Sequence, residues 1–144
     1  MYSNYKFKLE SILNYRGQLE EMLKKEFSTL QESLLMEETR LVELEEFYGA
    51  RASEMLSKDE ITPAELEVYR GYLTLIKEKI IDARNTLEII EQKIDKKRDQ
   101  LMEASKEKKV MEAVKDKGLK EHIRAEAKSE QVVSDEFNVN KFGK

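Results

Sequence analysis

The fold is decided by residues 62–111, which read TPAELEVYRGYLTLIKEKIIDARNTLEIIEQKIDKKRDQLMEASKEKKVM. Apolar and small side chains recur there at alternating intervals of three and four residues, which is the heptad pattern of a coiled-coil helix. The seam positions are Leu66, Tyr69, Leu73, Ile76, Ile80, Ala83, Leu87, Ile90, Ile94, Lys97, Leu101, Ala104, Lys108 and Met111. Beyond residue 111 the apolar seam fades, so the stretch predicts a long helix with one apolar edge and a polar continuation.

A start signal precedes this helix. Thr62 can accept a hydrogen bond from a free backbone N–H of the first turn, Pro63 suits the first helical position, and Glu65 can complete a capping box. The preceding residues 57–61 break the heptad pattern. We therefore expect a short loop directly before the helix.

A second heptad pattern lies before that loop. Its seam positions are Leu9, Leu13, Leu23, Phe27, Leu30, Leu34, Glu37, Leu41, Leu44, Tyr48, Arg51 and Met55. Between Leu9 and Leu23, a competing seam through Ile12, Arg16 and Leu19 predicts a four-residue stutter that locally unwinds the supercoil. Charged seam residues are expected to be half-buried and to set the register at some cost in stability. They are Glu37, Arg51 and Lys97.

Two long helices joined by a short loop must fold back on each other. The sequence thus predicts an all-α fold, a long two-helix antiparallel coiled-coil hairpin with a C-terminal helical overhang, as a single domain over residues 1–144. The expected bounds are about 6–57 for the first helix, about 58–62 for the loop, about 63–130 for the second helix and about 131–144 for a frayed or extended tail.

The register of the hairpin has two solutions. In an antiparallel pair the residue numbers of facing seam positions add up to a constant, and 117 and 124 both suit this loop. A constant of 124 places Leu30 opposite Ile94, whereas 117 places Leu30 opposite Leu87. In both, the first helix ends opposite residues 111–118, and the second helix projects beyond it. A single helix without a seam is marginal in water, so we expect the overhang to fray or to dock on a partner.

The composition of the chain argues against several classes of function. Charged residues make up 39% of the chain, with 26 basic and 30 acidic side chains interspersed. A nucleic-acid-binding protein would normally show a basic face, so nucleic acid is not an expected partner. Cysteine is absent, which excludes disulfides and thiolate metal sites. No apolar run reaches the roughly 18 residues of a membrane span, and we expect a soluble, cytoplasmic protein.

Catalytic motifs are missing from the sequence. His122 is the single histidine, and it falls where a solvated helix residue is expected. Carboxylates occur at helical spacing beside Lys and Arg, which indicates pairing within a helix. A two-helix ribbon also lacks the concave, water-excluding pocket that acid–base chemistry needs. We therefore expect no enzyme activity, no cofactor and no metal.

The aromatic residues suggest binding surfaces. Phe27 and Tyr48 fall on the seam and are expected to pack in the core. Tyr72 falls at a flank of the seam, where it either covers the core or forms part of an exposed docking patch. Phe137 and Phe142 lie in the expected tail, where they either fold back on the hairpin or anchor a partner.

Both ends of the chain carry recognisable motifs. Residues 5–16 read YKFKLESILNYR and precede Glu20 and Glu21, and residues 134–137 read SDEF and precede Lys141 and Phe142. Together with YRGYL at residues 69–73, these motifs resemble the flagellar export protein FliJ family. That family opens with Phe-x-Leu-x-x-x-Leu-x-x-Arg-x-x-x-Glu-Glu and closes with an Asp-Glu segment, a basic residue and an aromatic residue.

The resemblance implies a soluble stalk or adaptor of the flagellar type III export apparatus, similar to the coiled-coil stalk of rotary ATPase gamma subunits. The implied partners are the hexameric export ATPase, the cytoplasmic part of the export gate and substrate chaperones, at the inner face of the cell membrane. The residues expected to contact partners are Tyr69, Tyr72 and Ile76 for the gate, and Arg16, Asp135, Glu136 and Phe137 for the ATPase. The alternative is a structural spacer or dimerising coiled coil unrelated to secretion.

Overall fold

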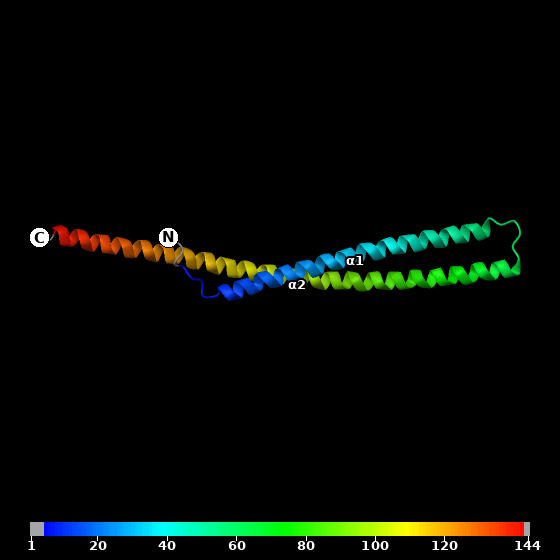
Figure 1. Ribbon diagram of the computed structural model, residues 1–144, viewed down its shortest axis with the longest axis horizontal. Coiled ribbons are helices and arrows are strands. Elements are labelled where there is room, and N and C mark those ends of the chain that lie inside the picture. The colour runs from blue at the N-terminus through cyan, green and yellow to red at the C-terminus, as the bar shows by residue number, and fades with distance from the viewer. Residues whose placement is uncertain (1–4, 143–144) are drawn as a thin grey trace. The chain divides into compact units, whose positions relative to one another are not determined.

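The computed structural model describes residues 5–142, with side chains described for residues 5–139. It contains two long helices, α1 (Glu10–Leu56) and α2 (Pro63–Phe142), joined by residues 57–62 (Figure 1). No strand occurs in this described part of the chain. The predicted all-α helical hairpin is therefore confirmed. The chain forms two compact units, and each contains residues of both helices.

The first turn of α2 forms part of the predicted capping box. The backbone N–H of Glu65 donates to Thr62 Oγ1 at 3.1 Å, and the N–H of Leu66 donates to the Thr62 carbonyl at 2.9 Å. Pro63 is the first residue of α2. The Glu65 carboxylate, however, lies 3.3 Å from Lys58 Nζ. Thr62 thus caps the helix, while Glu65 ties its first turn to the loop.

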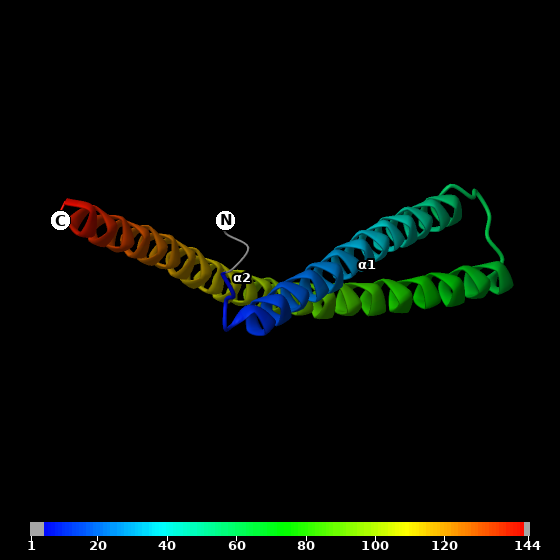
Figure 2. The ribbon, with the colours of Figure 1, turned by 60° about the vertical axis from the view of Figure 1, so that its left-hand side comes forward.

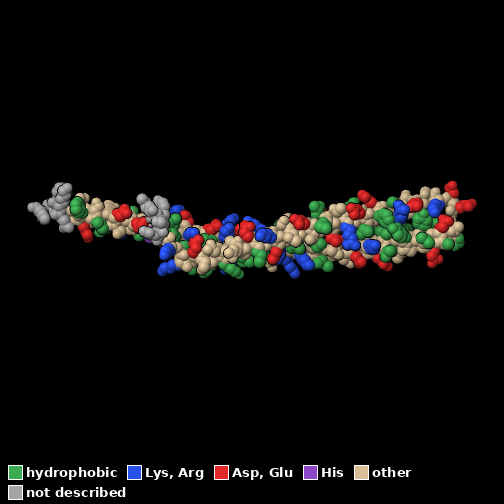
Figure 3. All heavy atoms as spheres, viewed as in Figure 1, with side chains coloured by type: hydrophobic (Ala, Val, Ile, Leu, Met, Phe, Trp, Pro, Cys, Tyr) green, Lys and Arg blue, Asp and Glu red, His purple; other side chains and the backbone are tan. Residues whose placement is uncertain are grey.

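Unit 2 spans residues 23–100 and contains the hairpin. Its buried core consists of Leu23, Ile76, Ile80, Ala83 and Ile94. The other predicted seam positions of this unit are half-buried, as expected where only two helices cover each other. Figure 3 shows hydrophobic side chains gathered along the line where α1 and α2 meet near the loop. Burial of this apolar seam, at roughly 25 cal/mol per Å², is the main stabilising contribution in unit 2.

The pairings across the helices decide the register. In unit 2, Lys97 contacts Glu26 and Arg98 lies over Phe27, so the paired residue numbers add up to 123 and 125. In unit 1, Ser105 and Lys115 contact Glu20 and Glu10, and both pairs add up to 125. The register with a constant of 124 is therefore the correct one of the two alternatives.

Unit 1 contains the first part of α1 and residues of α2 from 101 onward. Its buried residues are Ala104 and, unexpectedly, Glu20. Leu13 and Arg16 are half-buried, whereas Ile12 is exposed. The heptad steps from Leu13 through Arg16 and Glu20 without interruption, so the predicted stutter is wrong. The prediction rested on the competing seam through Ile12, Arg16 and Leu19.

Helix α2 continues to Phe142, so the predicted tail from about residue 131 is wrong. Residues 131–142 contain neither proline nor glycine. Extending an existing helix is far less costly than nucleating one, and the moderate propensities of Ser134 and Asn138 do not stop it. At the other end, α1 begins at Glu10 rather than near residue 6, after a turn in which the Glu10 N–H donates to the Phe7 carbonyl at 3.1 Å. Neither helix, over its described residues, has a segment long and apolar enough to cross a membrane.

Candidate partner-binding surfaces

An exposed apolar patch lies on unit 2. It comprises Phe47 of α1 and Val68, Tyr72 and Leu75 of α2, and it is called the aromatic patch below. The Phe47 and Tyr72 rings pack at a tilt of 59° with centroids 5.8 Å apart, a favourable edge-to-face type of contact. Phe47 and Tyr72 are 41% and 43% exposed, so the pair covers the seam and still presents its outer faces to solvent.

Neighbouring side chains contact the aromatic patch. Val68, Tyr72 and Leu75 are three and four residues apart, which places them side by side on one helix face. The Arg51 guanidinium lies 5.2 Å from the Phe47 ring centroid, and it also pairs with Glu54 at 2.8 Å. A cation held over an aromatic ring stabilises the ring's position by about 0.5–1 kcal/mol at exposed sites. The Phe47 ring thus packs against both Tyr72 and Arg51.

Tyr69 and Ile76, the other two residues expected at the gate, are placed differently. Ile76 is 4% exposed and belongs to the core, so it supports the helix beneath Tyr72 instead of facing outward. Tyr69 is half-buried, and Lys58 Nζ lies 5.1 Å from its ring centroid. Hydrogen bonding to Tyr69, and secondarily to Glu65, raises the pKa of Lys58. Lys58 is therefore fully charged at neutral pH and fixes Tyr69 next to the loop.

Polar and charged pairs interrupt the apolar seam in unit 1. The Ser105 hydroxyl donates to Glu20 Oε2 at 2.6 Å, and Lys108 Nζ lies 3.4 Å from Glu20 Oε1. Arg16 pairs with Glu107 in the same region, and Lys115 Nζ lies 2.9 Å from a Glu10 carboxylate oxygen. Sequence reasoning missed Glu20, although the unbroken three-and-four spacing from Leu13 to Leu23 passes through it. An ion pair between two helices forms only when its two residues face each other. These pairs therefore fix the alignment of α1 with α2 more than they stabilise the coiled coil.

Arg16 was expected to contact the ATPase. In the structure its guanidinium is paired with Glu107 and is half-buried. It therefore acts first within the coiled coil, and a partner could reach only its exposed part.

The N-terminal segment lies against α2 within unit 1 (Figures 1 and 2). The Tyr5 hydroxyl donates to the Lys115 carbonyl at 3.4 Å, and the Tyr5 ring centroid lies 5.4 Å from that of His122. His122 Nε2 in turn lies 3.0 Å from Glu126 Oε1. A Cβ atom at Gly118 would lie 2.3 Å from the Tyr5 hydroxyl oxygen. Gly118 therefore does not interrupt the helix, and the missing side chain provides the space for Tyr5.

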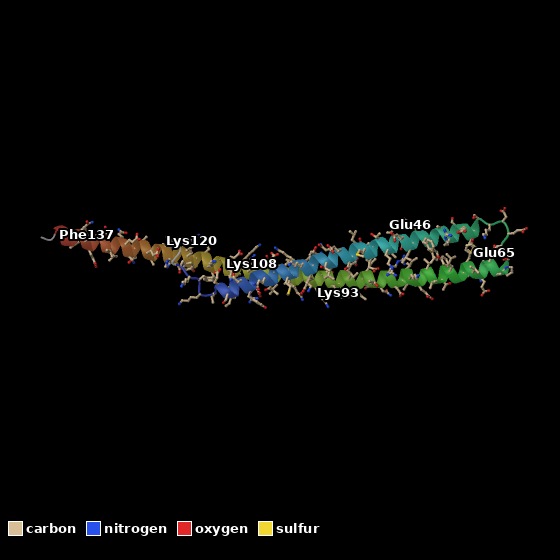
Figure 4. All side chains as sticks on the ribbon, in the orientation of Figure 1. Glu46, Glu65, Lys93, Lys108, Lys120 and Phe137 are labelled. Atoms are coloured by element: carbon tan, nitrogen blue, oxygen red, sulfur yellow. The ribbon has the colours of Figure 1, made fainter. Side chains whose placement is uncertain are left out.

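The last part of α2 is exposed on all sides. Every residue from 127 to 139 is exposed, including the predicted site residues Asp135, Glu136 and Phe137. Val132, Asp135, Glu136 and Val139 line a shallow groove of about 380 Å³ on one helix face. Phe137 lies on a stretch of α2 beside which no α1 runs, and it is 67% exposed (Figure 4). Phe142 lies beyond the residues whose side chains are described.

Exposed apolar side chains thus lie on both units, around Phe47 and Tyr72 and at the end of α2. Among the described residues, no group of three or more His, Asp or Glu side chains is arranged to hold a metal ion. The family model for the flagellar FliJ protein matches residues 5–144. The chain belongs to this family, a family of coiled-coil proteins associated with flagellar protein export. No curated protein and no solved structure shows a significant match to it.

Proposed function

We propose that the protein is a non-enzymatic stalk or adaptor that binds the hexameric export ATPase through the exposed end of α2 and the cytoplasmic part of the export gate through the aromatic patch. The observation that carries this proposal is the end of α2, where exposed Val132, Val133 and Phe137 flank two carboxylates. A surface helix with several exposed apolar residues and no covering element is typical of a binding segment.

The aromatic patch supports the second contact. It is separate from the end of α2 in sequence, and it combines tyrosine, phenylalanine and a nearby arginine. These residue types are enriched at the energetic centres of protein interfaces. A protein with two independent binding surfaces can connect two partners, which is what coupling an ATPase to a gate requires. Substrate chaperones are a further proposed partner, and association with the membrane would be indirect, through the gate.

The test is co-purification with the export ATPase, with turnover and hexamer formation measured in the presence and absence of the protein. The expected result is a complex, more hexamer and faster turnover. Val132→Ala combined with Phe137→Ala should weaken the ATPase effect by about 30-fold or more, since truncating central interface anchors costs at least about 2 kcal/mol. Gate binding by this variant should be unchanged.

The matched control variant changes the aromatic patch and leaves the end of α2 intact. Phe47→Ala combined with Tyr72→Ala should reduce gate binding and leave the ATPase effect intact. Far-UV circular dichroism checks that each variant is still helical. A wild-type protein that neither binds the ATPase nor changes its turnover refutes the stalk proposal. It would leave the alternative of a structural spacer or dimerising coiled coil.

A further inference from the structure

A second groove lies on unit 2, away from the aromatic patch. It has a volume of about 650 Å³ and is lined by residues of α1 (Lys25, Glu26, Thr29, Leu30) and of α2 (Lys93, Lys96, Lys97, Gln100). Four of these eight lining residues are lysines, and Leu30 is the one with an apolar side chain. Figure 4 shows Lys93 projecting from α2 in this region. We call it the basic groove.

The charge of the basic groove is unusual for this chain. Four lysines face one glutamate, Glu26, whose carboxylate lies 2.5 Å from Lys97 Nζ. The groove thus carries a net charge of +3 in a protein of net charge −4. Lys25, Lys93 and Lys96 are exposed. Such a groove favours an occupant that is acidic and has an apolar face, because the lysine stems contact apolar groups while their ammonium groups pair with carboxylates.

The chain itself contains a segment with these properties. Residues 129–139 of α2 include three acidic residues, Glu130, Asp135 and Glu136, and no basic residue. Val132 and Val139 lie seven residues apart on the same helix face as Asp135 and Glu136. All of these side chains are exposed. The segment is therefore an acidic helix with an apolar edge, and the carboxylates of Asp135 and Glu136 lie on the same face as Val132 and Val139.

We propose that the basic groove binds residues 129–139 of a second copy of this chain, so that the protein self-associates through lysine–carboxylate pairs and apolar contacts with Leu30. The groove and the segment both include residues of α2, which is one continuous helix and cannot fold back on itself without breaking. The occupant therefore comes from another molecule. The inference holds whether or not the ATPase is a partner, because it depends only on these two surfaces.

Self-association of this kind has a consequence for the proposed function. It covers Val132, Asp135 and Glu136, which also belong to the surface assigned to the ATPase. The same segment cannot occupy a groove and a partner at once, so free ATPase would release the protein from its self-associated form.

The experiment is sedimentation velocity of the full chain from about 5 to about 300 µM, since association of this kind follows mass action. At low ionic strength the expected result is a concentration-dependent shift to larger species. Raising NaCl from about 50 to about 500 mM should weaken association by about tenfold, because salt screens exposed charges. Lys93→Glu combined with Lys96→Glu should abolish the shift. A wild-type chain that stays monomeric throughout overturns the proposal.

Two further variants make the test specific. Lys106→Glu combined with Lys109→Glu makes the same charge change at the same spacing, at exposed positions of α2 that do not line the groove. It should associate more than the groove variant does, and equal loss in both would overturn the assignment to the groove. Asp135→Lys combined with Glu136→Lys should be monomeric alone but should associate when mixed with the groove variant. Failure of that mixture to associate also counts against the proposed pairing.

The absence of cysteine from the chain permits a positional check. A copy with Thr29→Cys and a copy with Val132→Cys should form a mixed disulfide under mild oxidation. Pairing of Thr29→Cys with Ser57→Cys, an exposed position outside the acidic segment, should be at least about tenfold slower, since cross-linking depends on how close the two thiols come. Equal rates would contradict the proposed contact.

Discussion

Replacing Glu20 with alanine should destabilise the protein by about 2 kcal/mol. Glu20 is 6% exposed, accepts a hydrogen bond from Ser105 and pairs with Lys108. A hydrogen bond to a charged group contributes about 1.5–3 kcal/mol, and breaking a fully buried pair costs about 3–5 kcal/mol. The lower part of this range applies, because the Lys108 side chain is 30% exposed and can turn toward Glu112, 3.8 Å away.

Replacing Glu20 with leucine, in contrast, should not destabilise the protein. Leucine suits a seam position next to Ala104, and a buried ion pair exchanged for a well-packed apolar residue is often neutral or stabilising by about 1–4 kcal/mol. Lys108 can then extend its ammonium group to water. We expect Glu20→Leu to be at least as stable as the wild type, with a less sharply defined register.

Urea unfolding followed by circular dichroism at the helix band measures both effects. With a slope of about 2 kcal/mol per molar urea, Glu20→Ala should lower the midpoint by about 1 M. Glu32→Ala, at an exposed position of α1, is the control and should stay within about 0.5 kcal/mol of the wild type. An unchanged midpoint for Glu20→Ala, or a lower midpoint for Glu20→Leu than for Glu20→Ala, would refute the assignment of a buried, paired carboxylate.

Three other outcomes are expected. Gly118→Ala should raise helix stability locally by up to about 1 kcal/mol but displace Tyr5, which makes an engineered tryptophan at position 5 more accessible to acrylamide quenching. Glu37→Leu should raise the urea midpoint, because Glu37 Oε2 is buried without a hydrogen-bond partner among the described residues and a seam leucine buries apolar area instead. The raised pKa of Lys58 means that its contact stabilises the fold fully below pH 10.5 and loses that effect only as pH rises through the higher folded-state pKa. An NMR titration of the Lys58 side chain in the native protein, with an apparent pKa at or below that of a model peptide, would contradict this.

The apolar seam of the hairpin could be predicted from the sequence because its period is a direct consequence of helix geometry. Ile76, Ile80, Ala83 and Ile94 were all placed on the seam and are all buried. Each of these residues is apolar or small, so the pattern and the chemistry agree. The register could not be predicted from the sequence, because pair sums of 117 and 124 were equally compatible with the loop length. Only contacts between the helices, such as that of Lys97 with Glu26, distinguish the two registers.

The missed features are those for which residue type and position disagree. Glu20 is charged on a seam, and its burial depends on Ser105 and Lys108, which are distant in sequence. Phe47 falls at a flank, and its role as half of an aromatic pair depends on which residue of α2 faces it. Gly118 looks like an interruption until Tyr5 is placed over it. In each case the deciding partner is distant in sequence and becomes adjacent only when the chain folds back on itself.

The two units of the chain differ in the kind of interaction that holds their helices together. Apolar residues fill the seam of unit 2, and apolar burial is non-directional and tolerates small shifts. Unit 1 relies on Glu20 with Ser105 and Lys108, on Arg16 with Glu107 and on Glu10 with Lys115. These contacts are directional and weaker in net stability. We infer that unit 2 supplies most of the stability and that unit 1 fixes the alignment of α1 with α2. A partner that binds the exposed end of α2 would therefore act next to the part of the coiled coil that is easiest to open.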